Sequence, residues 1–141
     1  MKFWDSSAII PLCLEEPNTR KLIDILSTDR NLVVWWGSSI ECYSALIRLK
    51  KEKAISESEW QDAQNILKNL EDSWIEIQPI SRVKEFAERI LRLHSLKAAD
   101  SFQLAAALLW AQNNPSEYDF VTFDNKLKIA AMKEGFKIFP E

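Results

Sequence analysis

Glycine, cysteine and histidine are scarce in this chain of 141 residues. The two glycines, Gly37 and Gly135, stand far apart, so the chain has no GxGxxG or Walker segment and no Gly-rich phosphate loop. Cys13 and Cys42 lie in apolar helical patterns and predict small core residues, because they are too few for a disulfide framework or a CxxC metal site. The single histidine, His94, makes neither a zinc site nor a Ser–His pair by itself, and we expect a capping or partly buried role for it.

Long apolar runs are missing as well. No stretch of about 18 apolar residues is present, so we expect no transmembrane helix. The N-terminus lacks the basic segment and apolar core of a signal peptide, which predicts a cytoplasmic protein without membrane association. The chain also has no Pro/Gly/Ser-rich linker, internal repeat or low-complexity segment, and we expect one domain over residues 1–141.

A strong excess of charge of one sign is also absent. The chain has 18 basic and 21 acidic residues, for a formal net charge of −3. Four acids of a candidate site, described below, account for all of this negative excess. The remaining surface is compatible with nucleic-acid binding but is not a strongly basic patch.

Short apolar segments alternate with helical patterns along the chain. Five segments predict strands, several of them rich in β-branched and aromatic residues: 1–4, 31–36, 74–77, 119–123 and 136–139. Helical spacing of apolar residues follows them, most clearly at 38–52, from about 83, and at 98–113. This alternation predicts an α/β fold, a three-layer α/β/α sandwich whose central sheet is mainly parallel.

Four acidic residues stand where a predicted strand gives way to a helix. Asp5 and Asp124 directly follow strands, whereas Glu41 and Asp100 lie at the start of helical patterns. In an alternating α/β chain these junctions meet at the carboxyl edge of the sheet, where ligands bind. Four carboxylates gathered there would repel one another without a cation, and Mg²⁺ or Mn²⁺ prefers such oxygen ligands. The pattern therefore predicts a metal site.

Each of three acids also has a purely structural explanation. Asp5 and Asp124 are favoured N-cap residues for the helices that follow them. Glu41 fits a capping box with Ser38, in which the glutamate returns a hydrogen bond to the N-cap amide. The sequence leaves both explanations open for these three residues.

Asp100 is harder to explain structurally. Leu104, Ala107 and Leu108 follow it at helical spacing, so its carboxylate extends an apolar stripe that should face the sheet. Burying an unpaired carboxylate is costly. Lys97, three residues earlier, offers only a surface pair worth about 0.2–0.5 kcal/mol. A bound cation explains the position of Asp100 better.

Three segments resemble the motifs of PIN domains. Residues 3–8 (FWDSSA) are similar to the opening strand that leads into Asp-Ser/Thr-Ser. Residues 96–105 (LKAADSFQLA) resemble the central motif, in which a basic and two small residues precede an Asp and Leu-Ala follows. Residues 121–124 (VTFD) resemble the late strand with Thr-x-Asp. The resemblance spans essentially the whole chain, and the length is similar to that of the stand-alone toxins of VapBC-type toxin–antitoxin pairs.

The chain departs from the common PIN pattern at two positions. Many relatives carry Ala where Ser101 stands and His where Gln103 stands. Neither position is a metal ligand in the family, so the mechanism that the resemblance implies is unaffected. Glu41, after Ile40, stands where the second acid of the family is expected.

The resemblance implies a PIN-like fold and a metal-dependent endoribonuclease that hydrolyses RNA phosphodiester bonds. Its Mg²⁺ or Mn²⁺ would be held, and its catalysis carried out, by Asp5, Glu41, Asp100 and Asp124. Bound metal supplies hydroxide near neutral pH and neutralises charge on the scissile phosphate. Ser6 and Thr122 are expected to hydrogen-bond the ligand carboxylates. Lys97 is either a contact to substrate phosphate or an ordinary solvated lysine.

Two alternatives stay open. One is a catalytically silent PIN-like scaffold that binds RNA or protein. The other is a phosphatase of the haloacid dehalogenase type, which also begins with a strand ending in Asp. Such enzymes use Asp-x-Asp there, whereas this chain has Asp5-Ser6-Ser7.

The aromatic pair Trp35-Trp36 predicts core packing or a dimer surface, with base stacking as the alternative.

The toxin resemblance also implies a cognate antitoxin protein, and we expect a homodimer. Many apolar residues of the N-terminal half cannot all reach one small core, so some should form an exposed groove for an amphipathic partner. These residues are Leu12, Leu14, Leu22, Ile25, Leu26, Leu46, Ile47 and Leu49.

Overall fold

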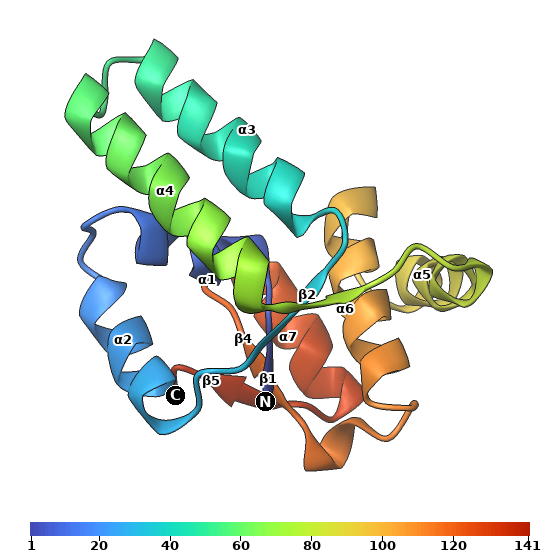
Figure 1. Cartoon of the computed structure of the whole chain (residues 1–141). Coiled ribbons are helices and arrows are strands. Elements are labelled where there is room, and N and C mark those ends of the chain that lie inside the picture. Colours follow the sequence, from blue (N-terminus) through green and yellow to red (C-terminus); the bar gives the residue numbers. More distant parts are fainter.

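A computed structural model describes residues 1–141 and contains one five-stranded sheet (Figure 1). The strands are β1 (Lys2–Trp4), β2 (Leu32–Trp35), β3 (Ile75–Ile77), β4 (Asp119–Val121) and β5 (Lys137–Phe139). They lie in the order β3-β2-β1-β4-β5, and each neighbouring pair is parallel. The predicted α/β sandwich is confirmed, and the sheet is parallel throughout.

Seven α-helices and one short 3₁₀ helix connect the strands. Four helices belong to the N-terminal half: α1 (Ser6–Cys13), α2 (Thr19–Thr28), α3 (Ser38–Lys51) and α4 (Glu57–Ser73). The C-terminal half contains α5 (Ser81–Leu93), α6 (Ala98–Trp110), η1 (Pro115–Glu117) and α7 (Asn125–Glu134). No helix has both the length and the apolar character that crossing a membrane requires.

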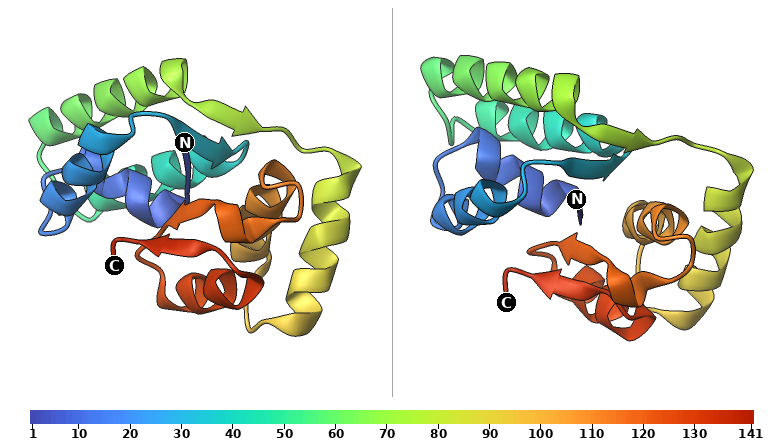
Figure 2. Two further views of the ribbon diagram at one scale, coloured as in Figure 1. Left: turned by 90° about the horizontal axis from the view of Figure 1, so that it is seen from below. Right: turned by 60° about the horizontal axis from the view of Figure 1, so that its bottom comes forward.

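The two faces of the sheet carry separate apolar cores. In β1, Phe3 points into a core shared with α5, α6 and α7, whereas Trp4 points into a core shared with α1 to α4. Figure 2 shows these two groups of helices on opposite sides of the sheet. Successive residues of a strand face opposite ways, so a sheet covered on both faces needs apolar residues at both positions. This requirement explains the continuous apolar run of β2.

The two cysteines, the histidine and Trp35 are largely buried in the structure, whereas Trp36 is exposed. Cys13 and Cys42 are free thiols in the core, which confirms their predicted burial. His94 ends α5, and its side chain is largely buried. Trp35 is buried and stacks on Phe102 of α6, with ring centroids 5.5 Å apart, whereas Trp36 is 51% exposed.

Candidate active site

Two of the four predicted site acids lie side by side at the centre of the sheet edge. Residues of β1 and β4 pair so that Trp4 lies opposite Val121, and the Asp5 amide donates to the Val121 carbonyl at 3.2 Å. Asp124 lies three residues beyond the end of β4 and directly before α7. The carboxyl ends of adjacent parallel strands therefore bring these acids, far apart in sequence, to one edge.

The other two acids come from helices next to this edge. Glu41 lies in the first turn of α3, which follows β2, the other neighbour of β1. Asp100 lies in the first turn of α6. The charge of Asp100 acts on Glu41, and the charge of Asp124 acts on both Asp5 and Asp100. The fold thus links all four acids through pairs of neighbouring like charges.

Asp5 is nearly inaccessible, with 3% of its surface exposed. Burial raises the pKa of its carboxyl group to about 7, and hydrogen bonds from Ser7 and Thr122 offset this effect only in part. The Ser7 hydroxyl donates to Oδ1 at 2.8 Å, and the Ser7 amide donates to Oδ2 at 3.3 Å. Asp5 is thus the N-cap of α1, as the structural explanation predicted, but it is also a desolvated acid without an ion-pair partner.

Two hydroxyl groups connect the junction after β1 with the junction after β4 through hydrogen bonds. The Thr122 hydroxyl accepts a hydrogen bond from the Asp124 amide at 3.0 Å, and the Ser7 hydroxyl accepts one from the Phe123 amide at 2.9 Å. The two hydroxyl oxygens are themselves 3.3 Å apart. Asp124 caps α7 by accepting from the Leu127 amide at 2.8 Å. These bonds restrict how Asp5 and Asp124 can move relative to each other.

Glu41 is held by a buried amide and not by the expected capping box. The N-cap of α3 is Gly37 and makes no side-chain cap bond, while Ser38 is already within the helix. Gln103 Nε2 instead donates to Glu41 Oε2 and to the Ser38 hydroxyl, both at 2.9 Å. The structural explanation for Glu41 is therefore wrong, because the carboxylate points across to α6 and not back to its own helix start.

The environment of Glu41 disfavours its charge. Burial raises the pKa of this carboxyl group, and the charge of Asp100 adds to the effect. Hydrogen bonds from Gln103 and from the Ser6 hydroxyl, the latter at 3.3 Å from Oε1, work in the opposite direction. Ser6 thus contacts Glu41, whereas Thr122 contacts Asp5 and the Asp124 amide.

Asp100 continues a buried apolar stripe, as its sequence position predicts. Leu104, Ala107 and Leu108 are fully buried, and Asp100 is half-buried above them. Burial and the charge of Asp124 raise the pKa of the Asp100 carboxyl group, while Lys97 and Lys126 oppose the rise.

Sequence reasoning missed four residues around the acids: Ser7, Ser38, Gln103 and Lys126. Gln103 lies three residues after Asp100 on α6, so helical spacing places both side chains on one face. That spacing was the one signal available for Gln103. Nothing in the local sequence indicates that Lys126 of α7 approaches Asp100 of α6.

The donor set fits a hard divalent cation. All four acids offer oxygen, three have pKa values raised by burial, and none takes part in the ion pairs of the structure. No group of three or more His, Cys, Asp or Glu side chains is arranged to hold a metal ion directly. Cap hydrogen bonds hold Asp5 and Asp124, and the Gln103 bond holds Glu41.

No family model and no curated protein sequence matches the chain. Three solved structures share its fold. PAE2754 from Pyrobaculum aerophilum is 20% identical with a TM-score of 0.64, covering 97% of this chain and 87% of that chain. FitAcB from Neisseria gonorrhoeae is 14% identical with a TM-score of 0.67, covering 99% and 96%. A toxin–antitoxin complex from Klebsiella pneumoniae is 17% identical with a TM-score of 0.61, covering 89% and 88%.

The chain has a PIN-like fold. The likeness extends over nearly the whole chain, which confirms the PIN-like fold that the sequence motifs imply. In this PIN-like fold the acids of those motifs lie at the carboxyl edge of the sheet.

Proposed function

We propose that the chain is a metal-dependent endoribonuclease that hydrolyses RNA phosphodiester bonds. The observation that carries this proposal is the set of four like-charged carboxylates at one sheet edge, without any protein cation paired to them. Such a set is unfavourable in a protein that does no more than fold, because buried acids normally have a partner. A bound cation removes that cost and provides a reason for the arrangement.

Asp5, Glu41, Asp100 and Asp124 would hold one or two Mg²⁺ or Mn²⁺ ions. When bound, such a metal supplies hydroxide near neutral pH and neutralises charge on a scissile phosphate. The protein contributes orientation: Ser7 and Thr122 hold Asp5, and Gln103 holds Glu41. Lys97, at the start of α6 and with its charge acting on Asp100, would meet a substrate phosphate.

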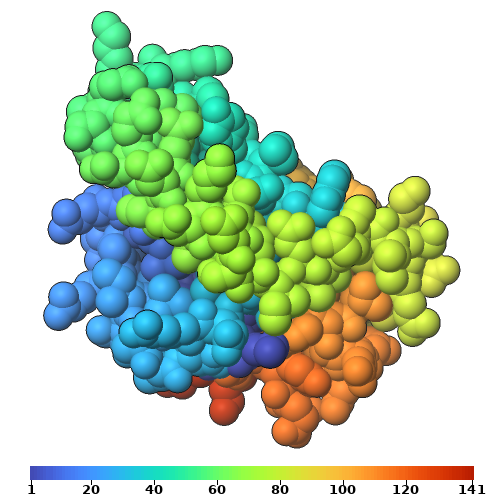
Figure 3. All heavy atoms as spheres, viewed as in Figure 1, coloured from blue at the N-terminus to red at the C-terminus, as the bar shows by residue number.

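We further propose that this nuclease is the toxin of a toxin–antitoxin pair in the cytoplasm. Support comes from the Klebsiella pneumoniae structure, a toxin–antitoxin complex with the same fold. The role requires a surface that an antitoxin protein can cover. A groove between α1, α2 and α4 meets this requirement and lies between the blue α2 and the green α4 in Figure 3.

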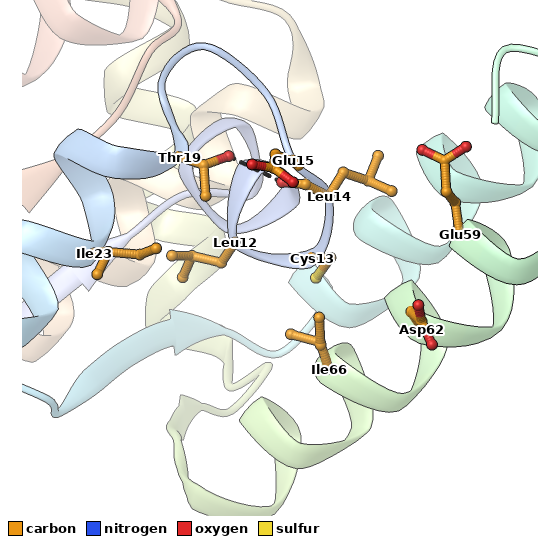
Figure 4. Close-up of a pocket in the computed structure, with 9 residues that line it drawn as sticks. All are labelled: Leu12, Cys13, Leu14, Glu15, Thr19, Ile23, Glu59, Asp62 and Ile66. Carbon is orange, nitrogen blue, oxygen red and sulfur yellow. Dashed lines mark hydrogen bonds between the residues drawn. The ribbon is translucent and has the colours of Figure 1, made fainter.

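This groove is apolar inside and acidic at its rim. Figure 4 shows Leu12, Ile23 and Ile66 facing the hollow from three helices. Its cavity measures about 400 Å³, and Glu59 and Asp62 of α4 line one side. An amphipathic antitoxin segment with apolar anchors and basic residues fits this lining. The expectation that the eight apolar residues cannot all reach one core is wrong, since all of them belong to the core beneath α1 to α4 or pack against it. Among them, Leu12 and Leu14 also line this groove, and Leu26 lines the adjoining one.

A cleavage assay tests the proposed activity. Purified protein is incubated with total cellular RNA in Mn²⁺, in Mg²⁺ or in EDTA, and the fragments are sequenced at their ends. We expect cleavage with either metal and none with EDTA. Intact RNA under all conditions, together with metal-independent RNA binding, would favour the silent scaffold. Release of phosphate from small phosphoesters without RNA cleavage would favour the phosphatase.

A further inference from the structure

A second groove, of about 270 Å³, lies between α7 and the connection from α5 to α6. Lys126 and Lys133 of α7 line one wall, and His94 lies in the other. Apolar and hydroxyl side chains complete the lining, and no carboxylate takes part. The groove between α1, α2 and α4 differs in this respect, because three acids line it.

Both walls of this groove end at the proposed catalytic acids. α7 begins directly after Asp124, and α6, with Asp100 in its first turn, begins directly after the connection. Lys126 is also close enough to Asp100 for its charge to act on that carboxylate. Figure 2 shows the gold connection beside the red α7 in both views. The groove therefore leads away from the acidic edge.

The two lysines form a row along α7. Lys126 and Lys133 are seven residues apart, so they lie on the same face of the helix, with their Cα atoms about 10 Å apart along its axis. Both are exposed, and neither takes part in any ion pair of the structure. Their charges are therefore available to an external anion.

An ion-pair network fixes the walls and neutralises the nearest acid. Glu134, next to Lys133 in sequence, accepts one hydrogen bond from Arg89 at 2.8 Å and pairs with His94 Nε2 at 2.7 Å. The network joins the end of α5 to the end of α7. The carboxylate that could have repelled an anion in the groove is thus already satisfied.

We propose that this groove binds the phosphates of single-stranded RNA beside the phosphate that is cleaved, through Lys126 and Lys133. The proposal rests on the proposed nuclease function. Exposed cationic side chains that take part in no ion pair suit a polyanion, and phosphate contacts position a strand without reading its sequence. Leu93 and Ile129, exposed to 61% and 54% in the same groove, offer apolar surface to unpaired bases.

Fluorescence anisotropy with a fluorescein-labelled single-stranded RNA of mixed sequence tests the groove. EDTA is present throughout, so binding is measured without cleavage. The variants are Lys126→Gln, Lys133→Gln and the double variant. Lys128→Gln is the matched control, since Lys128 lies on the same helix about 200° from Lys126 and outside the groove. Thermal melting by circular dichroism confirms that each variant is folded.

We expect the double variant to bind the RNA at least about tenfold more weakly than the parent at low salt. The slope of log affinity against log salt should decrease by about 0.7 for each lysine removed. The control should bind like the parent. Equal binding by the parent and all four variants, or no binding by the parent, would overturn the proposal.

A parallel cleavage assay in Mn²⁺ separates this proposal from the nuclease proposal. Cleavage by the parent, together with unchanged RNA binding by the double variant, would overturn the groove proposal alone. Weakened binding by the double variant, together with no cleavage by the parent under any condition, would support RNA binding at the groove and overturn the nuclease proposal.

Discussion

Asp5 is the site acid whose ionisation in the folded protein is disfavoured by nearly complete burial. Its folded pKa of about 7 lies above the ordinary value of 3.8, so its contribution to stability is present in full below about pH 4. That contribution is lost as pH rises through 7, when the buried carboxyl group must ionise. The cost follows from burial more than from the neighbouring Asp124.

Asp5→Asn should therefore make the metal-free protein less sensitive to pH. Asparagine keeps the size and the N-cap role of Asp5 but cannot ionise. We expect the melting temperature of the parent in EDTA to fall between pH 5 and pH 8 by clearly more than that of the variant, since about three pKa units correspond to at most about 4 kcal/mol. Differential scanning fluorimetry across this range is the measurement. Parallel curves would show that Asp5 is not desolvated.

Asp100→Asn should abolish cleavage without unfolding the protein. The substitution removes a charge and little volume, while metal ions supply several kcal/mol of transition-state stabilisation. We expect the rate of RNA cleavage in Mn²⁺ to fall at least about a hundredfold, and the stabilisation of the fold by Mn²⁺ to weaken. Asp72→Asn, at an exposed position of α4, is the matched control and should cleave at the parent rate. Parent-like cleavage by Asp100→Asn would rule out the proposed mechanism.

Gln103 acts as a positioning residue between α3 and α6. Gln103→Leu keeps a similar volume but leaves Glu41 and Ser38 without their buried donor. We expect a loss of about 1–3 kcal/mol in the free energy of unfolding, measured in urea, because a hydrogen bond to a buried carboxylate is lost. Gln103→Glu would place a second carboxylate beside Glu41 and should cost more in EDTA. A variant as stable as the parent would contradict a structural role for the hydrogen bonds from Gln103 to Glu41 and Ser38.

At the scale of elements, the junction of α5 and α7 depends on one carboxylate. Burial tends to raise the pKa of Glu134, but hydrogen bonds from His94 and Arg89 and their charges outweigh it, so the pKa lies below its ordinary value of 4.5. A lowered pKa stabilises the fold above the unfolded value, and this stability is lost as pH falls through the folded value. The junction should thus weaken in acid.

Glu134→Gln tests the junction. At pH 7 we expect the variant to lose about 1–3 kcal/mol of unfolding free energy, since hydrogen bonds between charged groups are broken. The difference from the parent should shrink as the pH is lowered below about 4.5, because protonation weakens the same bonds in the parent. Urea denaturation at pH 7 and at pH 4 measures both values. A difference that stays constant with pH would mean that the charge of Glu134 is unimportant.

A second element-scale feature is the close approach of β2 to α6. A Cβ atom at Gly37 would lie 2.7 Å from Trp35 Nε1, so only glycine fits beside the indole ring. Trp35 in turn stacks on Phe102, in an arrangement that places α6 and its Asp100 over the end of β2. One of the two glycines of the chain thus serves the position of the candidate site.

At the scale of the whole molecule, an apolar surface remains uncovered at the start of α3. Trp36 and Ile40 are exposed to 51% and 69%, and Tyr43 to 42%. We propose that this surface forms a two-fold homodimer, because closed symmetry commonly covers such patches.

Sedimentation velocity at micromolar concentration tests the dimer. We expect the parent to sediment as a dimer and Ile40→Asp as a monomer, since a charge in an apolar interface is costly to desolvate. Ile66→Asp, on α4 and exposed to 38%, places the same charge elsewhere and should remain dimeric. A monomeric parent would contradict the proposed homodimer.

The sequence alone was sufficient to predict the strands, the class of fold and the strand-to-helix junctions that carry Asp5 and Asp124, whereas Asp100 follows helix α5 and not a strand as expected. Each depends on a local property: a continuous apolar run, helical spacing, or an acid directly after a strand. Parallel strands turn those local positions into one shared edge, so Asp5 and Asp124 could be expected to meet. The apolar spacing alone set no bounds for α2 or α4.

Only the tertiary structure showed what surrounds the acids. The bond from Gln103 to Glu41, the approach of Lys126 to Asp100 and the lysine groove each join elements separated by many residues. The absence of the Ser38 capping box has the same origin, because a donor from α6 competes successfully for the Glu41 carboxylate. Burial raises the pKa of Asp5 only when β4 and the surrounding helices exclude water from it. Such effects depend on distances through space, which a local sequence pattern does not contain.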